Sequence, residues 1–374
     1  MEIAKAVERL PLMDERVEKA RERMAAAWEG REPDVLPLVI PGTPPRELMA
    51  DLPTYDLQEA YYDPDKMLFN HLRGLLRSAY SPGDSIPSMR ADMGCGIFPT
   101  LLGAEYTIRP DVRPWITGHV SKQKLMQMTP DEIDPYSGEF GRGLEYMAYF
   151  KKLLEGRVFI YTMDVQGPID TAHQVLGDAF FTELYDDPPF MHHLLELCTQ
   201  ALIKGIKACK EVNGEGHDWA YHYNTIYASR GGIKTSEDTT TLLREAHIQE
   251  FGVPYVRKLL QAFGGGWIHF CGSNPHLYEA CLRDIPEASG LNFGDPQRFN
   301  PDTVIADCQA AGIVYNGSLP YPDRPSVDEY YARIWRALGG NKQGLLLHGP
   351  AGDDPARTTA IWRKLQESPP ERVS

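Results

Sequence analysis

A histidine and a cysteine two residues apart, His269 and Cys271, stand at the end of a short apolar run and are followed by Gly272. In a β-strand, residues at i and i+2 point to the same face, so the imidazole and the thiol would leave the backbone together. One rigid element would then deliver two metal ligands. From these residues alone, the alternative is a buried cysteine beside a hydrogen-bonded histidine, because both residue types are common inside proteins.

A second histidine, His348, directly follows the apolar run 345–347. Together with His269 and Cys271 it would supply three protein ligands and leave one position open, which is the pattern of catalytic zinc sites. Nitrogen and sulfur ligands suit Zn²⁺ better than Mg²⁺, which prefers oxygen. We therefore predict a Zn²⁺ site of His269, Cys271 and His348. The alternative for His348 is a substrate hydrogen bond with no metal.

The elements that must position these residues are short apolar runs that alternate with helical patterns. Eight such strand candidates are found, at 36–40, 88–94, 158–163, 218–223, 267–271, 290–293, 313–316 and 344–348. This alternation predicts a parallel sheet, and eight units predict closure into a (β/α)₈ TIM barrel. A doubly wound open sheet is the alternative fold. No G-x-G-x-x-G motif follows an early strand, which argues against a dinucleotide site.

The domain organisation follows from the same pattern. We predict an N-terminal helical extension over 1–34, a single barrel domain over 35–366 and a tail over 367–374. The segment 108–138 is rich in proline and polar residues and lacks periodicity, so we expect an irregular surface insertion or lid there.

Polar residues gather where the predicted strands end, and the chemistry of such barrels sits at those carboxyl ends. We predict catalytic roles for Asp92 and His348. The predicted substrate contacts are Asp164, Gln166, Tyr223 (with Asn224 beside it), Asp238, Asn292 and Asn316. Polar residues are also ordinary where any strand leaves a core, and Asp238 would most simply be a solvated loop carboxylate.

Composition narrows the class of protein. The chain has 374 residues, 42% of them hydrophobic and 24% charged, as in a soluble globular protein. Its formal net charge of −14 argues against binding nucleic acid or an anionic membrane through bulk electrostatics. Without a long apolar run or a signal-peptide core, we expect a cytoplasmic protein. Six irregularly spaced cysteines do not suggest a disulfide framework.

The chain resembles the uroporphyrinogen decarboxylase superfamily, which includes cobalamin-dependent methyltransferases acting on coenzyme M. The stretch 268–272 (Ile-His-Phe-Cys-Gly) is similar to the His-x-Cys-Gly motif of the methyltransferase branch. The run 344–350, which contains His348, stands where that branch has its third ligand, a cysteine. The segment 164–168 (Asp-Val-Gln-Gly-Pro), followed by Asp187-Pro188, is similar to the family's Gly-Pro segment and helix start. The resemblance extends from about Val35 to Leu365 and implies a (β/α)₈ barrel.

The resemblance also includes departures. The Arg-Gln-Ala-Gly-Arg run of true uroporphyrinogen decarboxylases is replaced by 40–44 (Ile-Pro-Gly-Thr-Pro), so the main clamp for the substrate's carboxylates is missing. Asp92 falls near the position of their active-site aspartate. Compared with the methyltransferase branch, this chain has His348 where that branch has a cysteine.

Two enzymatic hypotheses follow from the residues and the resemblance. The first is a zinc-dependent methyltransferase that moves a methyl group between a corrinoid carried by a partner protein and a thiol or similar acceptor. The second is a metal-free decarboxylase of a smaller carboxylated substrate, in which Asp92 stabilises positive charge and His348 orients the substrate. A barrel that binds a ligand or a corrinoid without turnover is the non-enzymatic alternative.

Overall fold

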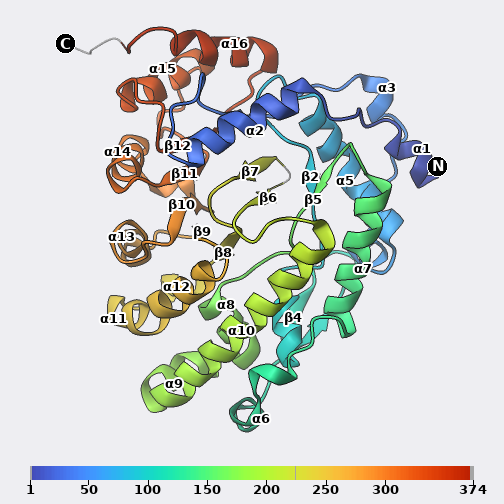
Figure 1. Ribbon diagram of the computed structural model, residues 1–374, viewed down its shortest axis with the longest axis vertical. Helices are drawn as coiled ribbons and strands as arrows, with labels where there is room; N and C mark the ends of the chain where they lie inside the picture. The colour runs from blue at the N-terminus through green and yellow to red at the C-terminus, as the bar shows by residue number, and fades with distance from the viewer. Residues whose placement is uncertain (1, 224, 371–374) are drawn as a thin grey trace.

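The parallel strands form a ring with helices outside it, seen end-on in the computed structural model (Figure 1), which describes residues 2–223 and 225–370. Ladders join six strands in the order β1-β12-β11-β10-β9-β8, and β2 pairs with β5. Single backbone hydrogen bonds bridge the two remaining places: the Asp84 N–H donates to the Leu38 carbonyl at 2.8 Å, and the Gly167 N–H donates to the Ser236 carbonyl at 2.5 Å. The fold is the predicted (β/α)₈ barrel. Its strands are β1 Leu38–Val39, β2 Ser88–Met89, β5 Phe159–Ile160, β8 Ile233–Ser236, β9 Gly266–Phe270, β10 Ala288–Phe293, β11 Val314–Gly317 and β12 Leu345–His348.

Many helices begin with the same two-residue signal. Asp63, Asp187, Asn274, Asn300 and Asp354 are each followed by proline, and each side chain accepts a hydrogen bond from the first turn of its helix. The helices are α1 Ile3–Val7, α2 Glu15–Trp28, α3 Arg46–Met49, α4 Leu57–Tyr62, α5 Pro64–Ala79, α6 Lys122–Gln127, α7 Gly138–Leu153, α8 Pro168–Leu176, α9 Ala179–Asp186, α10 Pro188–Asn213, α11 Glu245–His247, α12 Val253–Gln261, α13 Pro275–Arg283, α14 Pro301–Ala311, α15 Val327–Ala337 and α16 Pro355–Leu365. Short 3₁₀ helices are η1 Phe98–Leu102, η2 Pro130–Glu132, η3 Asp238–Leu242 and η5 Pro296–Arg298, and a π turn, η4 Ile248–Gly252, joins α11 to α12.

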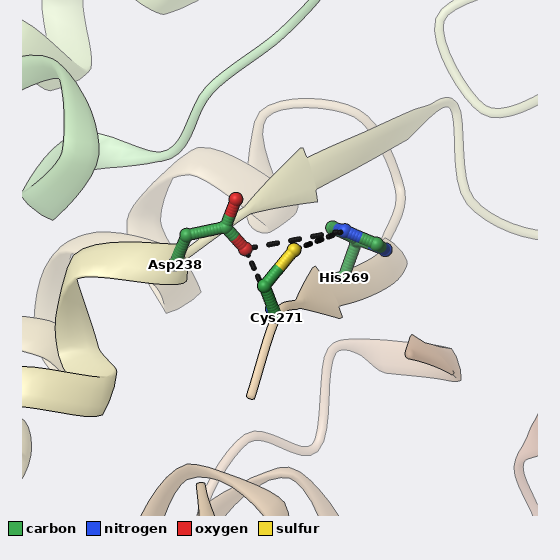
Figure 2. A group of neighbouring side chains, drawn as sticks. All are labelled: Asp238, His269 and Cys271. Carbon is green, nitrogen blue, oxygen red and sulfur yellow. Dashed lines mark hydrogen bonds and ion pairs between the residues drawn. The ribbon is translucent and has the colours of Figure 1, made fainter. Parts of the chain in front are cut away.

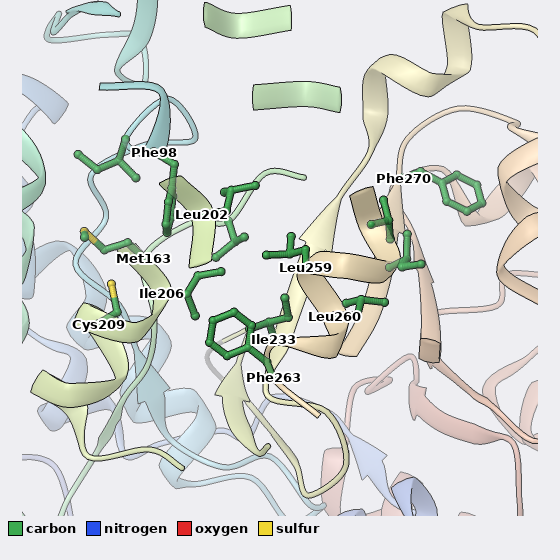
Figure 3. Close-up of a cluster of buried hydrophobic side chains, with 14 of the residues drawn as sticks. Phe98, Met163, Leu202, Ile206, Cys209, Ile233, Leu259, Leu260, Phe263 and Phe270 are labelled. Atoms are coloured by element: carbon green, nitrogen blue, oxygen red, sulfur yellow. The ribbon is translucent and has the colours of Figure 1, made fainter. Parts of the chain in front are cut away.

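Strand β9 divides its side chains between two cores. On β9, Ile268 and Phe270 point outward into the large core between strands and helices, whereas Trp267 lies in a second core inside the barrel. Figure 3 shows part of the outer core, where Leu202 of α10 and Leu259 of α12 belong to the same cluster of buried side chains. The alternation of β9 therefore turns His269 inward, toward the barrel axis.

The amino-terminal end of the barrel is filled by α2 and by an antiparallel hairpin of β6 Ala220–His222 and β7 Ile226–Ala228. The rings of Trp28 on α2 and Trp267 on β9 lie 5.4 Å apart, and the His222 ring is 5.3 Å from Trp267. In Figure 1 the hairpin occupies the middle of the ring of strands. The barrel interior is thus packed with aromatic side chains at this end.

This hairpin corrects the prediction for the fourth barrel strand. The segment 218–223 supplies β6, which pairs with β7 and not with the barrel, and the fourth barrel strand is β8, in a stretch that the sequence suggested was a loop. The reason is physical: Lys234 and Ser236 of β8 are polar and buried, so the strand does not show an apolar run.

The insertion is also more regular than predicted. It contributes β4 Trp115–Gly118, paired with β3 Glu105–Thr107, and then α6 and η2. Asn224 and the last residues of the predicted tail, 371–374, lie outside the described residues. Within residues 2–223 and 225–370, no helix combines the length and apolar character that crossing a membrane requires.

Candidate metal centre and active-site cavity

Three potential ligands meet at the carboxyl ends of two neighbouring strands, β8 and β9. Asp238 is the first residue of η3, two residues after the end of β8, while His269 is the penultimate residue of β9 and Cys271 directly follows that strand. The ligand atoms of the three lie within 4.8 Å of one another (Figure 2). The Cys271 Sγ is 3.6 Å from the His269 Nε2, and that nitrogen is 3.9 Å from the Asp238 Oδ1.

Backbone hydrogen bonds hold this group in shape. The Cys271 N–H donates to the Asp238 Oδ1 at 2.7 Å, so the loop after β8 and the end of β9 are tied together at the site itself. The next N–H, that of Gly272, donates to the Asp295 Oδ2 at 2.7 Å. Gly272 has a φ of 75°, a left-handed conformation that glycine adopts without strain. The glycine of the His-Phe-Cys-Gly stretch is therefore needed for the turn that follows the cysteine.

A chain of polar side chains fixes the orientation of the His269 ring. Its Nδ1 lies 2.5 Å from the Oδ1 of Asn292 on β10. The same oxygen also accepts the Tyr223 hydroxyl at 3.3 Å, and the Asn292 amide nitrogen donates to the carbonyl of Asn316 on β11. An amide oxygen can only accept, so the proton of His269 must be on Nδ1 and the lone pair on Nε2, facing Cys271.

This series of hydrogen-bonded residues ends at His348 on β12. Its Nε2 lies 2.8 Å from the Asn316 Oδ1, which makes Nε2–H the donor in this pair. Burial lowers the pKa of His348 to about 4, so the ring is neutral at neutral pH. Among the described residues, His348 is not part of the group of potential ligands. The structure brings the predicted pair His269 and Cys271 together with Asp238, which was predicted as a substrate contact, in the place expected for His348.

The distance between the His269 nitrogen and the Cys271 sulfur fits zinc. With bond lengths of about 2.1 Å to nitrogen and about 2.3 Å to sulfur, a tetrahedral ion separates the two ligand atoms by about 3.6 Å, the distance found between His269 and Cys271. Burial, with the charge of Lys234, lowers the pKa of His269, which keeps the imidazole neutral as a ligand must be. Burial and the carboxylate of Asp238 raise the pKa of Cys271 to about 12, so a cation is needed to make it a thiolate.

An ion cluster that the sequence did not reveal lies beside this group. Arg90 binds Asp164 through both of its terminal nitrogens, at 2.9 and 3.1 Å, and Lys234 is 3.6 Å from the same carboxylate. Burial alone would raise the pKa of Asp164, but the two cations outweigh it and hold the pKa well below its ordinary value. Asp164, predicted as a substrate contact, is therefore occupied by internal partners. Ser88, Arg90 and Asp92 occupy alternate positions in the sequence, and from this alternation the inward position of Arg90 could have been predicted.

A cavity of about 930 Å³ opens at the carboxyl end of the barrel. It is bounded on one side by the group of Asp238, His269 and Cys271, called here the metal group, and on the other side by the insertion. Of the predicted residues, it is lined by Asp92, Asp164, Gln166, Tyr223, Asp238 and His269. Tyr223 reaches it from the tip of the β6–β7 hairpin and not from a barrel strand, with a φ of 50°. Asn292 and Asn316 act behind the site, through the hydrogen bonds to the histidines. Further lining residues include His71, Arg90, Arg113, Trp115, His119, His173 and Lys234.

A barrel whose strand ends carry a nitrogen, a sulfur and an oxygen ligand beside a large cavity belongs to the class of (β/α)₈ proteins with a candidate transition-metal centre. Comparison with known proteins names the family. The family model of uroporphyrinogen decarboxylase (URO-D) matches residues 19–295, and the chain belongs to this family.

Among solved structures, a methyltransferase from Methanosarcina mazei is similar, with a TM-score of 0.62 and 15% sequence identity over 93% of this chain and 98% of that chain. At this identity the likeness shows the shared fold. No curated protein matches the chain in sequence.

Proposed function

We propose that the protein is a zinc-dependent methyltransferase of the URO-D family that moves a methyl group from a corrinoid on a partner protein to a thiol or similar acceptor. The observation that carries the proposal is the convergence of Asp238, His269 and Cys271 at the barrel mouth, with the histidine nitrogen and the cysteine sulfur at the separation expected for two ligands of one zinc ion. The solved methyltransferase with the same fold supports this direction.

The chain's own residues have defined tasks in this proposal. His269, Cys271 and Asp238 would hold Zn²⁺ and leave one position free for the substrate. When bound, the ion supplies a Lewis acid that lowers the pKa of a thiol. Asn292 keeps the Nε2 of His269 unprotonated and aimed at the site. In the overall reaction a sulfur–carbon bond forms, the cobalt–carbon bond breaks with its electron pair left on cobalt, and the thiol proton is released.

The rim of the cavity suits a partner protein. Trp115, which lines the cavity, is 55% exposed, and Leu242, at the end of the helix that Asp238 begins, is 70% exposed. Tryptophan is enriched at protein interfaces, where its ring offers a large apolar contact. We infer that the corrinoid protein docks over this rim and presents its cobalt to the metal group.

The test begins with the metal content of the purified protein and the transfer of methyl from methylcobalamin to a simple thiol. We expect one zinc per chain, lost in His269→Ala, Cys271→Ser and Asp238→Ala and retained in His348→Ala, which serves as the matched control. Loss of zinc in His348→Ala together with retention in Asp238→Ala would replace Asp238 by His348 as the ligand. A metal-free wild-type protein with unchanged activity in the Cys271 variant would refute the proposal.

A second candidate, a decarboxylase of a carboxylated small molecule, rests on Asp92. Its Oδ1 is buried and accepts no hydrogen bond from any residue within the described part of the chain, although Arg90 is 3.6 Å away. Such an oxygen could stabilise a cationic intermediate in the cavity. Release of CO₂ that is abolished in Asp92→Asn and unaffected by chelators would favour this candidate over methyl transfer.

A further inference from the structure

A second cavity, of about 350 Å³, lies beside the main one and shares three lining residues with it: His71, Asp92 and Arg113. It runs between α4, α5 and the start of the insertion. Its volume is near the lower end of small-molecule pockets, about 300 to 1,000 Å³. The two cavities thus meet at a partition made of side chains.

The partition is held by a weak contact. Arg113 and Asp92 approach each other only to 4.0 Å, and the Arg113 side chain is 68% exposed. An exposed ion pair at this distance contributes about 1 kcal/mol or less, so movement of Arg113 is easy. Burial lowers the pKa of His71, the third member, which therefore adds a neutral imidazole and no further ion pair to the partition.

A glycine inside a helix, Gly74, lies at the outer end of the second cavity. Met67, His71 and Gly74 line the cavity along one face of α5, at the spacing of successive helical turns. A Cβ at Gly74 would meet no atom within 4 Å, so glycine is not needed there for close packing. Glycine in a helix interior costs about 1 kcal/mol relative to alanine. Because Gly74 is exposed and has open space around it, we take this end of the second cavity as its entrance.

We propose that the small acceptor enters and is seated through this second cavity, called here the side portal, while the partner protein covers the main mouth. This inference rests on the proposed function, because a docked corrinoid protein would block the mouth to the second substrate. The portal is defined by α4, α5 and Pro114, with Gly74 at its outer end and the Asp92–Arg113 partition at its inner end.

The lining of the portal selects the acceptor's chemistry. Its walls combine apolar side chains, with Leu57, Ala60, Met67 and Leu75 among them, and the polar side chains of Asn70, His71 and Arg113. Inside the barrel, the cations Arg90 and Lys234 are already bound by Asp164. Arg113, which is only 4.0 Å from Asp92 at its nearest and 68% exposed, is the cation that an acceptor meets between the two cavities. The portal therefore suits a small thiol with an apolar body, and Arg113 can pair with an anionic end of that thiol.

The test fills the portal without crowding the fold. In Gly74→Trp the new side chain occupies the outer end, and Arg77→Trp, one turn further along α5 on an exposed position that lines neither cavity, is the matched control. With methylcobalamin as donor and 1-butanethiol as acceptor, we expect kcat/KM for the thiol to fall about tenfold or more in Gly74→Trp. The KM for methylcobalamin should not change, and Arg77→Trp should behave as wild type.

Binding is measured in parallel, by calorimetric titration of 1-butanethiol and of 3-sulfanylpropanoate into the zinc-loaded protein. We expect both thiols to bind, and their binding to be weakened in Gly74→Trp but not in Arg77→Trp. If turnover is absent but this pattern of binding is found, the portal stands and the proposed function falls. If turnover occurs and the two tryptophan variants behave alike in kinetics and binding, the portal is refuted. Failure of both thiols to bind the zinc-loaded wild-type protein refutes the assigned acceptor class.

Discussion

The hydrogen bond from His269 to Asn292 gives a sharp test of the metal centre, because it lies behind the site and touches no substrate. Replacing Asn292 by leucine removes the oxygen that holds the His269 proton on Nδ1, at 2.5 Å in the structure. The free ring then distributes its proton between both nitrogens and rotates more freely. Loss of such supporting partners typically weakens metal binding by 10- to 100-fold, about 1.4 to 2.7 kcal/mol.

The measurement is the dissociation constant for zinc, obtained by competition with a chelator of known affinity. Cobalt substitution adds a second readout, since a thiolate bound to Co²⁺ has its own absorption band and reports Cys271 directly. Asn292→Asp is the matched control: it retains an accepting oxygen at the same place and should keep zinc affinity within a few-fold of wild type. An Asn292→Leu protein that binds zinc as tightly as wild type would refute the role of the hydrogen-bonded chain.

Three further predictions concern stability and metal removal. Asp164→Asn leaves Arg90 and Lys234 without their carboxylate and should destabilise the fold by about 3 to 5 kcal/mol in urea unfolding at pH 7. Because the pKa of Asp164 is lowered in the folded state, its contribution is complete above the unfolded value of about 3.9 and is lost below it, so the gap to wild type should shrink at pH 3; an equal gap at both values would contradict the ion cluster. Trp28→Ala should destabilise by about 3 to 5 kcal/mol through the cavity left against Trp267, with zinc affinity unchanged. Removing the metal with a chelator should leave the circular dichroism spectrum intact, and zinc at 100 times its dissociation constant should raise the stability by about 2.7 kcal/mol.

The barrel could be predicted from the sequence because seven of its strands contain runs of apolar residues or alternate clearly, and because helices with Asp-Pro or Asn-Pro starts separate many of them. The fourth strand could not. Strands that line a polar cavity carry charged residues inward, as Lys234 does on β8, and so lose the apolar signal on which strand prediction depends. The sequence predicts a barrel strand at β6 instead. This segment is fully buried inside the barrel, so its sequence has the character of a buried strand.

The missed strand also bears on the predicted ligands. With a loop expected at 229–241, Asp238 is predicted as a solvated carboxylate, although it lies two residues after the strand next to β9. His348 looked suitable because it ends an apolar strand, but the order of strands places β12 three positions from β9. Sequence spacing gives the level of a residue along the barrel axis and not its position around the ring. In this structure Asp238, after the neighbouring strand, lies within reach of a shared ion, whereas His348 is connected to His269 only through Asn316 and Asn292.

Asn292 and Asn316 are those intermediaries, one on each strand between β9 and β12. Asn292 accepts from His269 and donates to the backbone carbonyl of Asn316, and the side chain of Asn316 accepts from His348. His269 and His348 are therefore the two ends of one series of hydrogen bonds. His348 is thus connected to His269 although it lies outside the group of potential ligands: its neutral Nε2–H donates to the side-chain oxygen of Asn316, and the backbone carbonyl of Asn316 accepts the amide of Asn292. The effect of a His348 variant on zinc should therefore be smaller than that of Asn292→Leu, because it acts through Asn316 and Asn292. A larger effect would place His348 in the metal site itself, and the order of the two effects thus separates a ligand from a support.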